Sequence, residues 1–345
     1  MRIEPSYRPN TEDPRPNTYS FIDWACQSAA AVWRVGRLPT PEVRPLAGDA
    51  SVRQFYRLSW PPDLSAVVMI VPSELAEQFT IQLSVYARLR HRWPVPTLWA
   101  VETNRRWVLM EDAGEPAQAW VAEALRRGDL AQVQVLYRSW LGLLQVLQAG
   151  PWDDGWIVFR RRLHDRWVPE FQFFEDHFLE GWAGVRLSER DRTRLWAGFG
   201  QVVDALNRLP TGICHRDYHS RNILLRDGRS AIVDYQDMQV GPLTYDPVSL
   251  LLDCYVVLPE SLVRTLWAEV ADRVPDETAW VQTALQRHVK ALGTFGYQVA
   301  RRGKTVYLPA MRNTLDYLLR GELAAEPDVA AILRPVLEDV RARLE

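Results

Sequence analysis

The chain has 345 residues, 47% of them hydrophobic, so it can form a large core, and its length fits two lobes better than one small domain. The formal net charge is −2 and no basic block occurs, which argues against nucleic acid or an anionic membrane surface as a partner. No apolar leader begins the chain, no run of about 18 apolar residues follows, and the three cysteines are odd in number and widely spaced. We therefore expect a cytoplasmic protein with free thiols and no membrane segment.

The first 110 residues are expected to form a strand-rich N-terminal lobe. Residues 1–18, rich in Pro, Asn, Arg and Glu, are predicted to be a loose arm. Apolar residues at helical spacing predict helices over 21–33 and 73–90, and apolar runs bounded by turns predict strands over 43–46, 52–58, 66–71 and 107–110.

Residues 111–345 are expected to form a mainly helical C-terminal lobe. The predicted helices cover about 130–147, 159–179, 195–206, 249–258, 260–272, 276–300, 307–323 and 327–344. Short apolar strands at 223–225 and 231–233 interrupt this series. The order of elements predicts an α+β protein with a bilobal, protein-kinase-like plan.

The segment HRDYHSRN at 215–222 and the aspartate at 234 predict a catalytic site for phosphoryl transfer. Phosphoryl transfer from ATP uses one carboxylate, such as Asp217, to orient the acceptor hydroxyl and take its proton. An Asp-Gly turn at 227–228 between two apolar runs predicts a hairpin, which would place Asn222 and Asp234 side by side. Two hard oxygen ligands suit Mg²⁺, which takes its other ligands from phosphate and water. Alternatively, Asn222 is a turn residue and Asp234 a cap or hairpin end.

Several segments resemble the aminoglycoside phosphotransferase and choline kinase-like family. They are HRDYHSRN at 215–222, IVDYQD at 232–237 and GPLTYDPVSLL at 241–251. Three more are similar to the bacterial N-acetylmuramate/N-acetylglucosamine anomeric kinases of cell-wall recycling within that family: LAGDAS at 46–51, VVM at 67–69 and LMED at 109–112. The likeness spans about residues 45–260. It implies a protein-kinase-like fold, ATP and Mg²⁺ as cofactors, and a small-molecule sugar as substrate.

The resemblance also implies roles for individual residues. They are Asp217 as the catalytic base, Asn222 and Asp234 as magnesium ligands, Glu111 and Ala113 as the hinge whose backbone binds the adenine edge, and Asp246 as a brace of the active loop. An ordinary exit from a strand to a loop would give the same hinge pattern, and a helix cap would explain Asp246.

The sequence departs from the kinase pattern at two places that usually bind the phosphate groups of ATP. The strand at 67–70 lacks the lysine that usually grips the α- and β-phosphates, and Gly48 is the only glycine of the phosphate loop. Ser51 and nearby amides could cradle phosphate, and Arg53, with Arg57 as a second candidate, could supply the positive charge. The alternative is that both arginines line a solvated strand face.

The acceptor site is expected between the metal loop and the aromatic helix at about 159–180. Its candidate residues are His219, Gln236, Asp237, Glu170 and His177, each of which could instead be structural. Residues 151–190 hold eight Asp or Glu and six Arg, so they do not form the acidic trough expected for polycationic aminoglycosides.

The chain is expected to be a monomer. The resemblance implies an ATP-dependent kinase that phosphorylates the anomeric hydroxyl of N-acetylmuramate, N-acetylglucosamine or both, in peptidoglycan recycling. One alternative is the same chemistry on another sugar, an aminoglycoside or an amino alcohol. The other, motivated by the missing lysine, is a nucleotide-binding scaffold without activity. The complete trio of Asp217, Asn222 and Asp234 argues against the scaffold.

Overall fold

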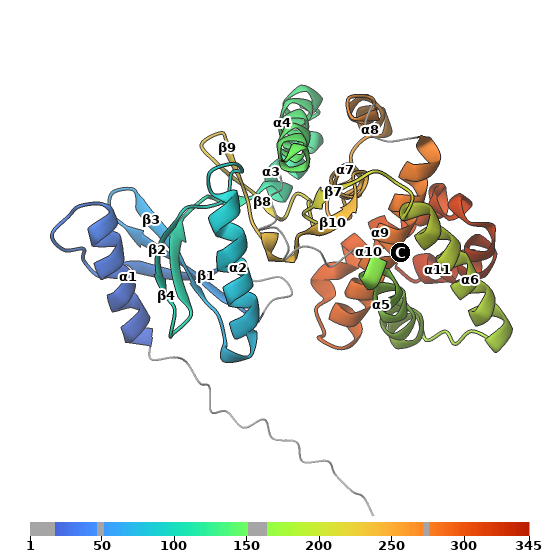
Figure 1. The fold of residues 1–345 in the computed structure, drawn as a ribbon, viewed down its shortest axis with the longest axis horizontal. Coiled ribbons are helices and arrows are strands. Elements are labelled where there is room, and N and C mark those ends of the chain that lie inside the picture. Colours follow the sequence, from blue (N-terminus) through green and yellow to red (C-terminus); the bar gives the residue numbers. More distant parts are fainter. Residues whose placement is uncertain (1–17, 47–51, 151–163, 272–275, 345) are drawn as a thin grey trace, which may run out of the picture. The chain divides into compact units, whose positions relative to one another are not determined.

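The computed structural model describes residues 18–46, 52–150, 164–271 and 276–344 (Figure 1). These residues form two compact units, one from the described parts of 1–79 and 97–112, the other from 80–96 and the described parts of 113–345. The predicted domain division, 1–110 and 111–345, stays a prediction; in the structure residues 80–96 group with the second unit. Within the described ranges no helix is both long and apolar enough to cross a membrane.

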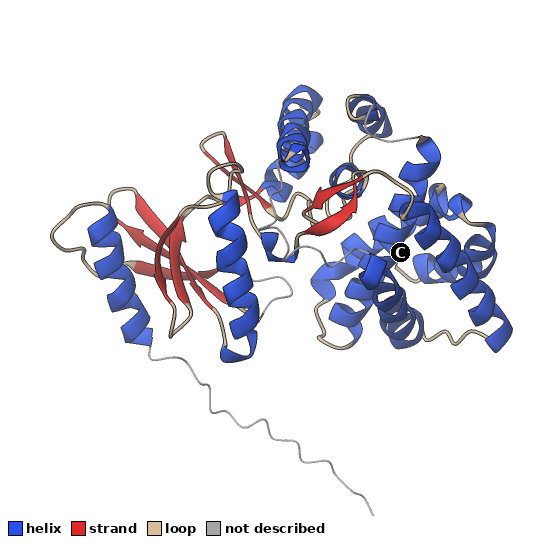
Figure 2. Cartoon of the chain, viewed as in Figure 1, coloured by secondary structure: helices blue, strands red, loops and turns tan. Residues whose placement is uncertain are grey.

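The first unit is built on an antiparallel five-stranded sheet, drawn in red in Figure 2. Its strands are β1 (Glu42–Leu46), β2 (Gln54–Trp60), β3 (Leu64–Ile70), β4 (Leu98–Glu102) and β5 (Trp107–Glu111), in the spatial order β1-β2-β3-β5-β4. Helix α1 (Thr18–Val32) packs beside β4 and β5. Phe21, Ala25 and Ala29 lie on one face of this helix because they are spaced by four residues, and they share a buried cluster with Leu58 and Leu109.

The second unit is mainly helical. Its helices are α3 (Ala117–Arg126), α4 (Leu130–Ala149), α5 (His164–Phe174), α6 (Glu189–Leu206), α7 (Tyr245–Leu251), α8 (Glu260–Ala268), α9 (Glu277–Ala300), α10 (Leu308–Arg320) and α11 (Pro327–Ala342). A π-helix, Glu175–Ala183, continues α5, and short 3₁₀ helices occur at Tyr235–Asp237, Thr305–Tyr307 and Glu322–Ala325. A 3₁₀ turn at Ser73–Leu75 precedes α2 (Ala76–Leu89), whose Val85 and Leu89 belong to the core of this unit.

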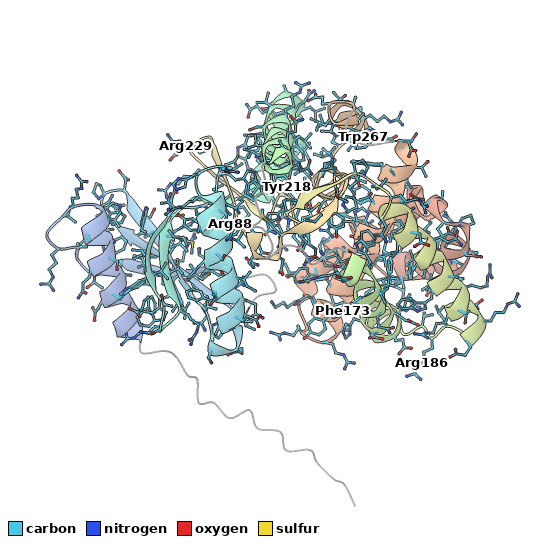
Figure 3. The ribbon with its side chains drawn as sticks, in the orientation of Figure 1. Arg88, Phe173, Arg186, Tyr218, Arg229 and Trp267 are labelled. Carbon is cyan, nitrogen blue, oxygen red and sulfur yellow. The ribbon has the colours of Figure 1, made fainter. Side chains whose placement is uncertain are left out.

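Two small antiparallel sheets lie within the helical unit. One contains β6 (Glu115–Pro116), β8 (Ile223–Arg226) and β9 (Arg229–Ile232), and the other pairs β7 (Thr211–Cys214) with β10 (Gln239–Pro242). The predicted hairpin is confirmed: β8 pairs with β9, and Arg229 marks its return strand in Figure 3. Asp227 and Gly228 both have positive φ, 50° and 74°, which is the conformation that a two-residue hairpin turn requires.

Helix α9 lies against α5 and the π-helix at very short range. A Cβ atom at Gly296 would lie 2.6 Å from the carbonyl oxygen of His177, and one at Gly293 would lie 3.0 Å from the Cα of Phe174. Any larger residue at these positions would push the helices apart. The two glycines therefore fix α9 at the distance from α5 at which the contacts of the site described below can form.

The sequence prediction was wrong for residues 252–258, which were expected to continue a helix from 249. Helix α7 ends at Leu251, and Leu252 has left the helical region, with φ −111° and ψ 47°. Asp253 then accepts hydrogen bonds from the backbone N–H groups of Ser220 and Tyr255, at 2.8 and 2.7 Å. Strand β4 and helix α3 were not predicted at all.

Candidate active site

The loop between β7 and β8, residues 215–222, is held by a buried carboxylate. Asp246, in the first turn of α7, accepts the backbone N–H of His215 at 2.6 Å and that of Arg216 at 2.9 Å. Arg216 has a φ of 75°, a left-handed conformation that a non-glycine residue adopts only when its surroundings impose it. Burial raises the pKa of Asp246, an effect that His215 opposes. Asp246 therefore braces the loop, as the sequence predicted.

The side chain of Arg216 ties this loop to two helices. Its Nη2 forms an ion pair with Oε1 of Glu170 on α5, and the other oxygen of Glu170 accepts from Nε2 of Gln286 on α9 at 2.8 Å. The side chain of Arg216 is 4% exposed and that of Glu170 13%, so water screens their charges weakly. Both carboxylate oxygens of Glu170 are thus engaged in holding the loop. Its predicted part in binding the acceptor stays a prediction.

Two cations approach the carboxylate of Asp217, the predicted catalytic residue. Nζ of Lys290 lies 3.0 Å from Oδ1 of Asp217, and Nη2 of Arg287 lies 3.7 Å from the same oxygen. Burial alone would raise the pKa of Asp217, but Lys290 and then Arg287 hold it well below its usual value. Asp217 is therefore ionised at neutral pH and can accept a hydrogen bond from a hydroxyl group.

Asn222 and Asp234 lie at the open end of the β8–β9 hairpin. The carbonyl oxygen of Asn222 accepts the N–H of Val233 at 3.0 Å, which places Asp234 next to Asn222 across the ladder. The side-chain N–H of Asn222 donates to the carbonyl oxygen of Asp217 at 2.9 Å, so its amide oxygen is the atom available to a cation. Asp234 is left-handed, with φ 65° and ψ 36°, and its Oδ1 accepts from Gln236 at 2.6 Å.

This pair fits a magnesium ion. An amide oxygen and a carboxylate are hard ligands, and Mg²⁺ commonly takes only one or two from the protein while phosphate oxygens and water complete its octahedron. In the part of the chain that the structure describes, no three His, Cys, Asp or Glu side chains gather as a metal site.

Residues 42–281 match the phosphotransferase enzyme family. The chain belongs to this family. It is an enzyme that transfers a phosphoryl group from ATP to a hydroxyl group.

Three curated relatives of this phosphotransferase carry the same name, N-acetylmuramate/N-acetylglucosamine kinase. The protein of Neisseria meningitidis serogroup B is 27% identical over 293 residues, which are 79% of this chain and 84% of the relative. That of Pseudomonas aeruginosa is 27% identical over 316 residues, 86% of this chain and 88% of the relative. That of Pseudomonas putida is 24% identical over 288 residues, 79% and 81% of the two chains.

Solved structures share the fold of this phosphotransferase at low sequence identity. The gentamicin complex of APH(2")-IIa aligns with a TM-score of 0.59 and 13% identity, covering 87% of this chain and 95% of that one. The choline kinase of Streptococcus pneumoniae aligns with a TM-score of 0.61 and 10% identity, covering 89% and 99%. The predicted α+β, protein-kinase-like fold is confirmed by these alignments and by the strand-rich and helical units.

Four residues of the phosphotransferase were predicted to bind the nucleotide, and the structure describes three of them. Ser51 lies outside the described residues, and Arg53 directly precedes β2. Oε2 of Glu111 accepts from the N–H and the hydroxyl of Thr97, at 3.1 and 3.0 Å, and the backbone N–H of Glu111 donates to the carbonyl oxygen of Thr97 at 2.8 Å. Ala113 is buried. Their roles toward ATP stay predictions.

Arg57, the second cation considered for phosphate, has a partner within the first unit. Its Nη2 donates a hydrogen bond to Oδ1 of Asp112 at 2.9 Å, its Nε lies 2.9 Å from Oδ2, and both side chains are nearly buried. This ion pair connects β2 to the residue after β5. Arg57 is thereby engaged in the first unit, and a phosphate contact by either arginine stays a prediction.

The residues predicted to bind the acceptor have different neighbours in the structure. His219 is buried with its ring against Tyr255, and burial lowers its pKa to about 3, so the ring is neutral. Asp237 lies 3.6 Å from Arg166, and Gln236 is bonded to Asp234.

His177 belongs to another group of side chains. It lies in the π-helix, where its ring meets those of Phe173, at 4.2 Å between centroids, and Tyr297, at 5.1 Å. Phe173 is labelled on α5 in Figure 3. His177 as an acceptor ligand stays a prediction.

Sequence reasoning missed the cations on α9. Neither Lys290 nor Arg287 lies in a motif that indicates a catalytic role. A signal was present, because a lysine is rare in a chain whose basic residues are nearly all arginine. No local pattern could have revealed that Lys290 meets a carboxylate 73 positions away.

Proposed function

We propose that this phosphotransferase phosphorylates the anomeric hydroxyl of N-acetylmuramate, N-acetylglucosamine or both, and so acts in peptidoglycan recycling. The observation that carries the proposal is the shared name of three relatives that align over at least 79% of this chain. The relatives align across residues of both units, so the likeness is not restricted to the motifs at 215–234.

In the proposed reaction Asp217 receives the sugar. The anomeric hydroxyl donates a hydrogen bond to the ionised carboxylate, which turns an oxygen lone pair toward the γ-phosphorus of ATP. Because the transition state of phosphoryl transfer is loose, the proton leaves late and Asp217 need not be a strong base. The low pKa of Asp217 is compatible with this orienting role.

Asn222 and Asp234 are proposed to hold Mg²⁺. When bound, the ion would neutralise charge on the β- and γ-phosphate oxygens. The hairpin keeps both ligands next to each other, and the bond from Asn222 to the carbonyl oxygen of Asp217 connects the ion site to the catalytic residue at 2.9 Å. Glu111, Ala113, Ser51 and Arg53 are proposed to contact ATP.

The charges around Asp217 favour a neutral or anionic acceptor. Lys290 and Arg287 are directed at the carboxylate and offset its negative charge. An aminoglycoside or an amino alcohol carries positive charge of its own, which these two cations would repel at short range. N-acetylation removes the amino charge of glucosamine, and the lactyl group of N-acetylmuramate adds a negative one.

An acceptor panel tests the proposal. ADP release from ATP is measured with N-acetylmuramate, N-acetylglucosamine, glucose, choline and gentamicin. We expect turnover with one or both N-acetylated sugars and none with choline or gentamicin, the two cationic acceptors. The methyl glycoside of N-acetylglucosamine, whose anomeric oxygen is blocked, is the matched control and should release no ADP. Turnover of the methyl glycoside at the rate of the free sugar, or of a cationic acceptor alone, would refute the proposal.

A further inference from the structure

Helix α9 presents two cations to a single oxygen atom. Lys290 and Arg287 are three residues apart, so both side chains leave the same face of the helix, and both approach Oδ1 of Asp217. In the described residues, the contacts of the Asp217 carboxylate fall on Oδ1. Oδ2 is thereby the oxygen left for a substrate.

The two cations differ in how they are held. Arg287 has a side chain that is 8% exposed, its Nε donates to Oγ of Ser249 at 3.0 Å, and its distance of 3.7 Å from Asp217 is too long for a hydrogen bond. Lys290 is 15% exposed and lies within hydrogen-bonding distance, 3.0 Å. Arg287 supplies charge from a position held by Ser249. Lys290 supplies the directional hydrogen bond.

We propose that Lys290 is a positioning residue for phosphoryl transfer: it grips Oδ1 of Asp217 and turns Oδ2 toward the acceptor hydroxyl. This inference rests on the proposed role of Asp217. The terminal torsion of an aspartate is broad, so an unrestrained carboxylate samples many orientations. A charge-assisted hydrogen bond to one oxygen removes most of that freedom before the substrate arrives.

The surroundings of Lys290 keep it in place. Gly293 and Gly296, three and six residues further along α9, fix this helix against α5 and the π-helix. Gln286, on the same helix, bonds Glu170, which in turn pairs with Arg216 next to Asp217. Lys290 therefore extends from a helix, and the loop that carries Asp217 is tied to the same helix through Arg216, Glu170 and Gln286.

A lysine suits this position better than an arginine. Lys290 and Lys304 are the only lysines among 41 basic residues, so lysine is not the usual cation of this chain. An ammonium group is a compact point charge that can bind one oxygen, whereas a guanidinium fork tends to bind both oxygens of a carboxylate. A guanidinium group at position 290 would compete with the acceptor hydroxyl for Oδ2 of Asp217.

A double-mutant cycle tests the proposal. The turnover number kcat and the KM values for ATP and both sugars are measured for Lys290→Met, for Asp217→Ala and for the double variant. We expect Lys290→Met to lower kcat roughly 10- to 100-fold, because a small misplacement of a reacting group costs about that much, with the KM for ATP unchanged. In the Asp217→Ala background the same change should have no further effect, because Lys290 acts through Asp217.

Chemical rescue separates positioning from a loss of folding. Lys290→Cys is treated with 2-bromoethylamine, which rebuilds an ammonium group on a chain of nearly the same length. We expect most of the lost kcat to return. The wild-type enzyme receives the same treatment, since Cys26 is only partly buried. Lys304→Met removes the other lysine and should leave kcat within twofold of wild type.

Each contrary result is specific. A kcat of Lys290→Met within twofold of wild type would overturn the proposal, and so would loss of activity that aminoethylation does not restore. Equal losses in both backgrounds would show that Lys290 acts independently of Asp217. A rise in KM for N-acetylmuramate alone would make Lys290 a ligand of the lactyl carboxylate instead. If Asp217→Ala retained its activity, the proposed role of Asp217 would fail, which is a different result from each of these.

Discussion

Nε2 of His215 lies 3.0 Å from the carbonyl oxygen of Val233, so a buried ring links the start of the catalytic loop to the residue before Asp234. Burial lowers the pKa of His215, and the neutral ring must carry its proton on Nε2 to donate to that carbonyl group. The link sets the distance between the residue that would orient the acceptor and one that would hold Mg²⁺. A substitution of His215 should therefore disturb the positions of both Asp217 and Asp234.

His215→Phe keeps a ring of similar size but leaves the Val233 carbonyl without its donor. We expect a loss of about 1–3 kcal/mol in the free energy of unfolding and a lower kcat. Urea denaturation and steady-state kinetics measure the two effects. His91→Phe, at an exposed position, is the matched control and should change neither. A His215→Phe enzyme with the kcat of wild type would show that the link is structural only.

Asp217→Asn should leave the binding of ATP nearly intact and lower kcat by orders of magnitude. The amide has the shape of the carboxylate but cannot accept a proton, and it carries no charge toward the hydroxyl. Calorimetry with ATP and Mg²⁺ measures the first effect and turnover the second. Asp227→Asn at the exposed hairpin tip is the control. Retention of most activity by Asp217→Asn would remove Asp217 from the catalytic role.

Asp234→Ala should abolish the Mg²⁺-dependent part of nucleotide binding, because one of the two proposed protein ligands is lost. Asp234→Asn is measured beside it, since asparagine also tolerates the left-handed backbone found at this residue. Both variants should bind ATP with the same weak affinity in the presence and absence of Mg²⁺. An unchanged calorimetric affinity in Asp234→Ala would contradict the assignment.

The parts of the fold that sequence reasoning predicted are those with a local cause. The Asp-Gly pair at 227–228, between two apolar runs, suits a turn with two positive φ angles, and it predicted the hairpin of β8 and β9. What it missed depends on long-range pairs. Lys290 contacts Asp217, which lies 73 residues earlier in the chain. Asp253, just beyond the end of α7, accepts a hydrogen bond from Ser220, 33 residues earlier. Such partners leave no periodic pattern in the chain.

Helix α9 also carries an ionisable pair that should make stability depend on pH. Nδ1 of His288 lies 2.7 Å from Oε2 of Glu322, and its ring stacks on Tyr317. Burial alone would lower the pKa of His288, but Glu322 and then Cys254 raise it to about 10. A raised pKa means that the folded state holds its proton more tightly than the unfolded chain, whose pKa is 6.5. The pair's contribution is complete below pH 6.5 and lost as pH rises to about 10.

His288→Gln tests this dependence. At pH 6.5 the variant should be less stable than wild type by about a few kcal/mol, given about 1.4 kcal/mol per unit of pKa shift in the same direction. The difference should shrink steadily toward pH 10. Urea denaturation at several pH values measures both proteins. A difference that stays constant between pH 6.5 and 10 would show that His288 is not protonated in the folded state.

The position of the new phosphate is the most direct test of the account. The product formed from ATP and N-acetylglucosamine or N-acetylmuramate is examined by ³¹P and ¹H NMR. We expect a phosphorus signal coupled to the proton of the anomeric carbon, and no such product from Asp217→Asn. A phosphate coupled to any other sugar proton, or no sugar phosphate at all, would contradict the proposed reaction.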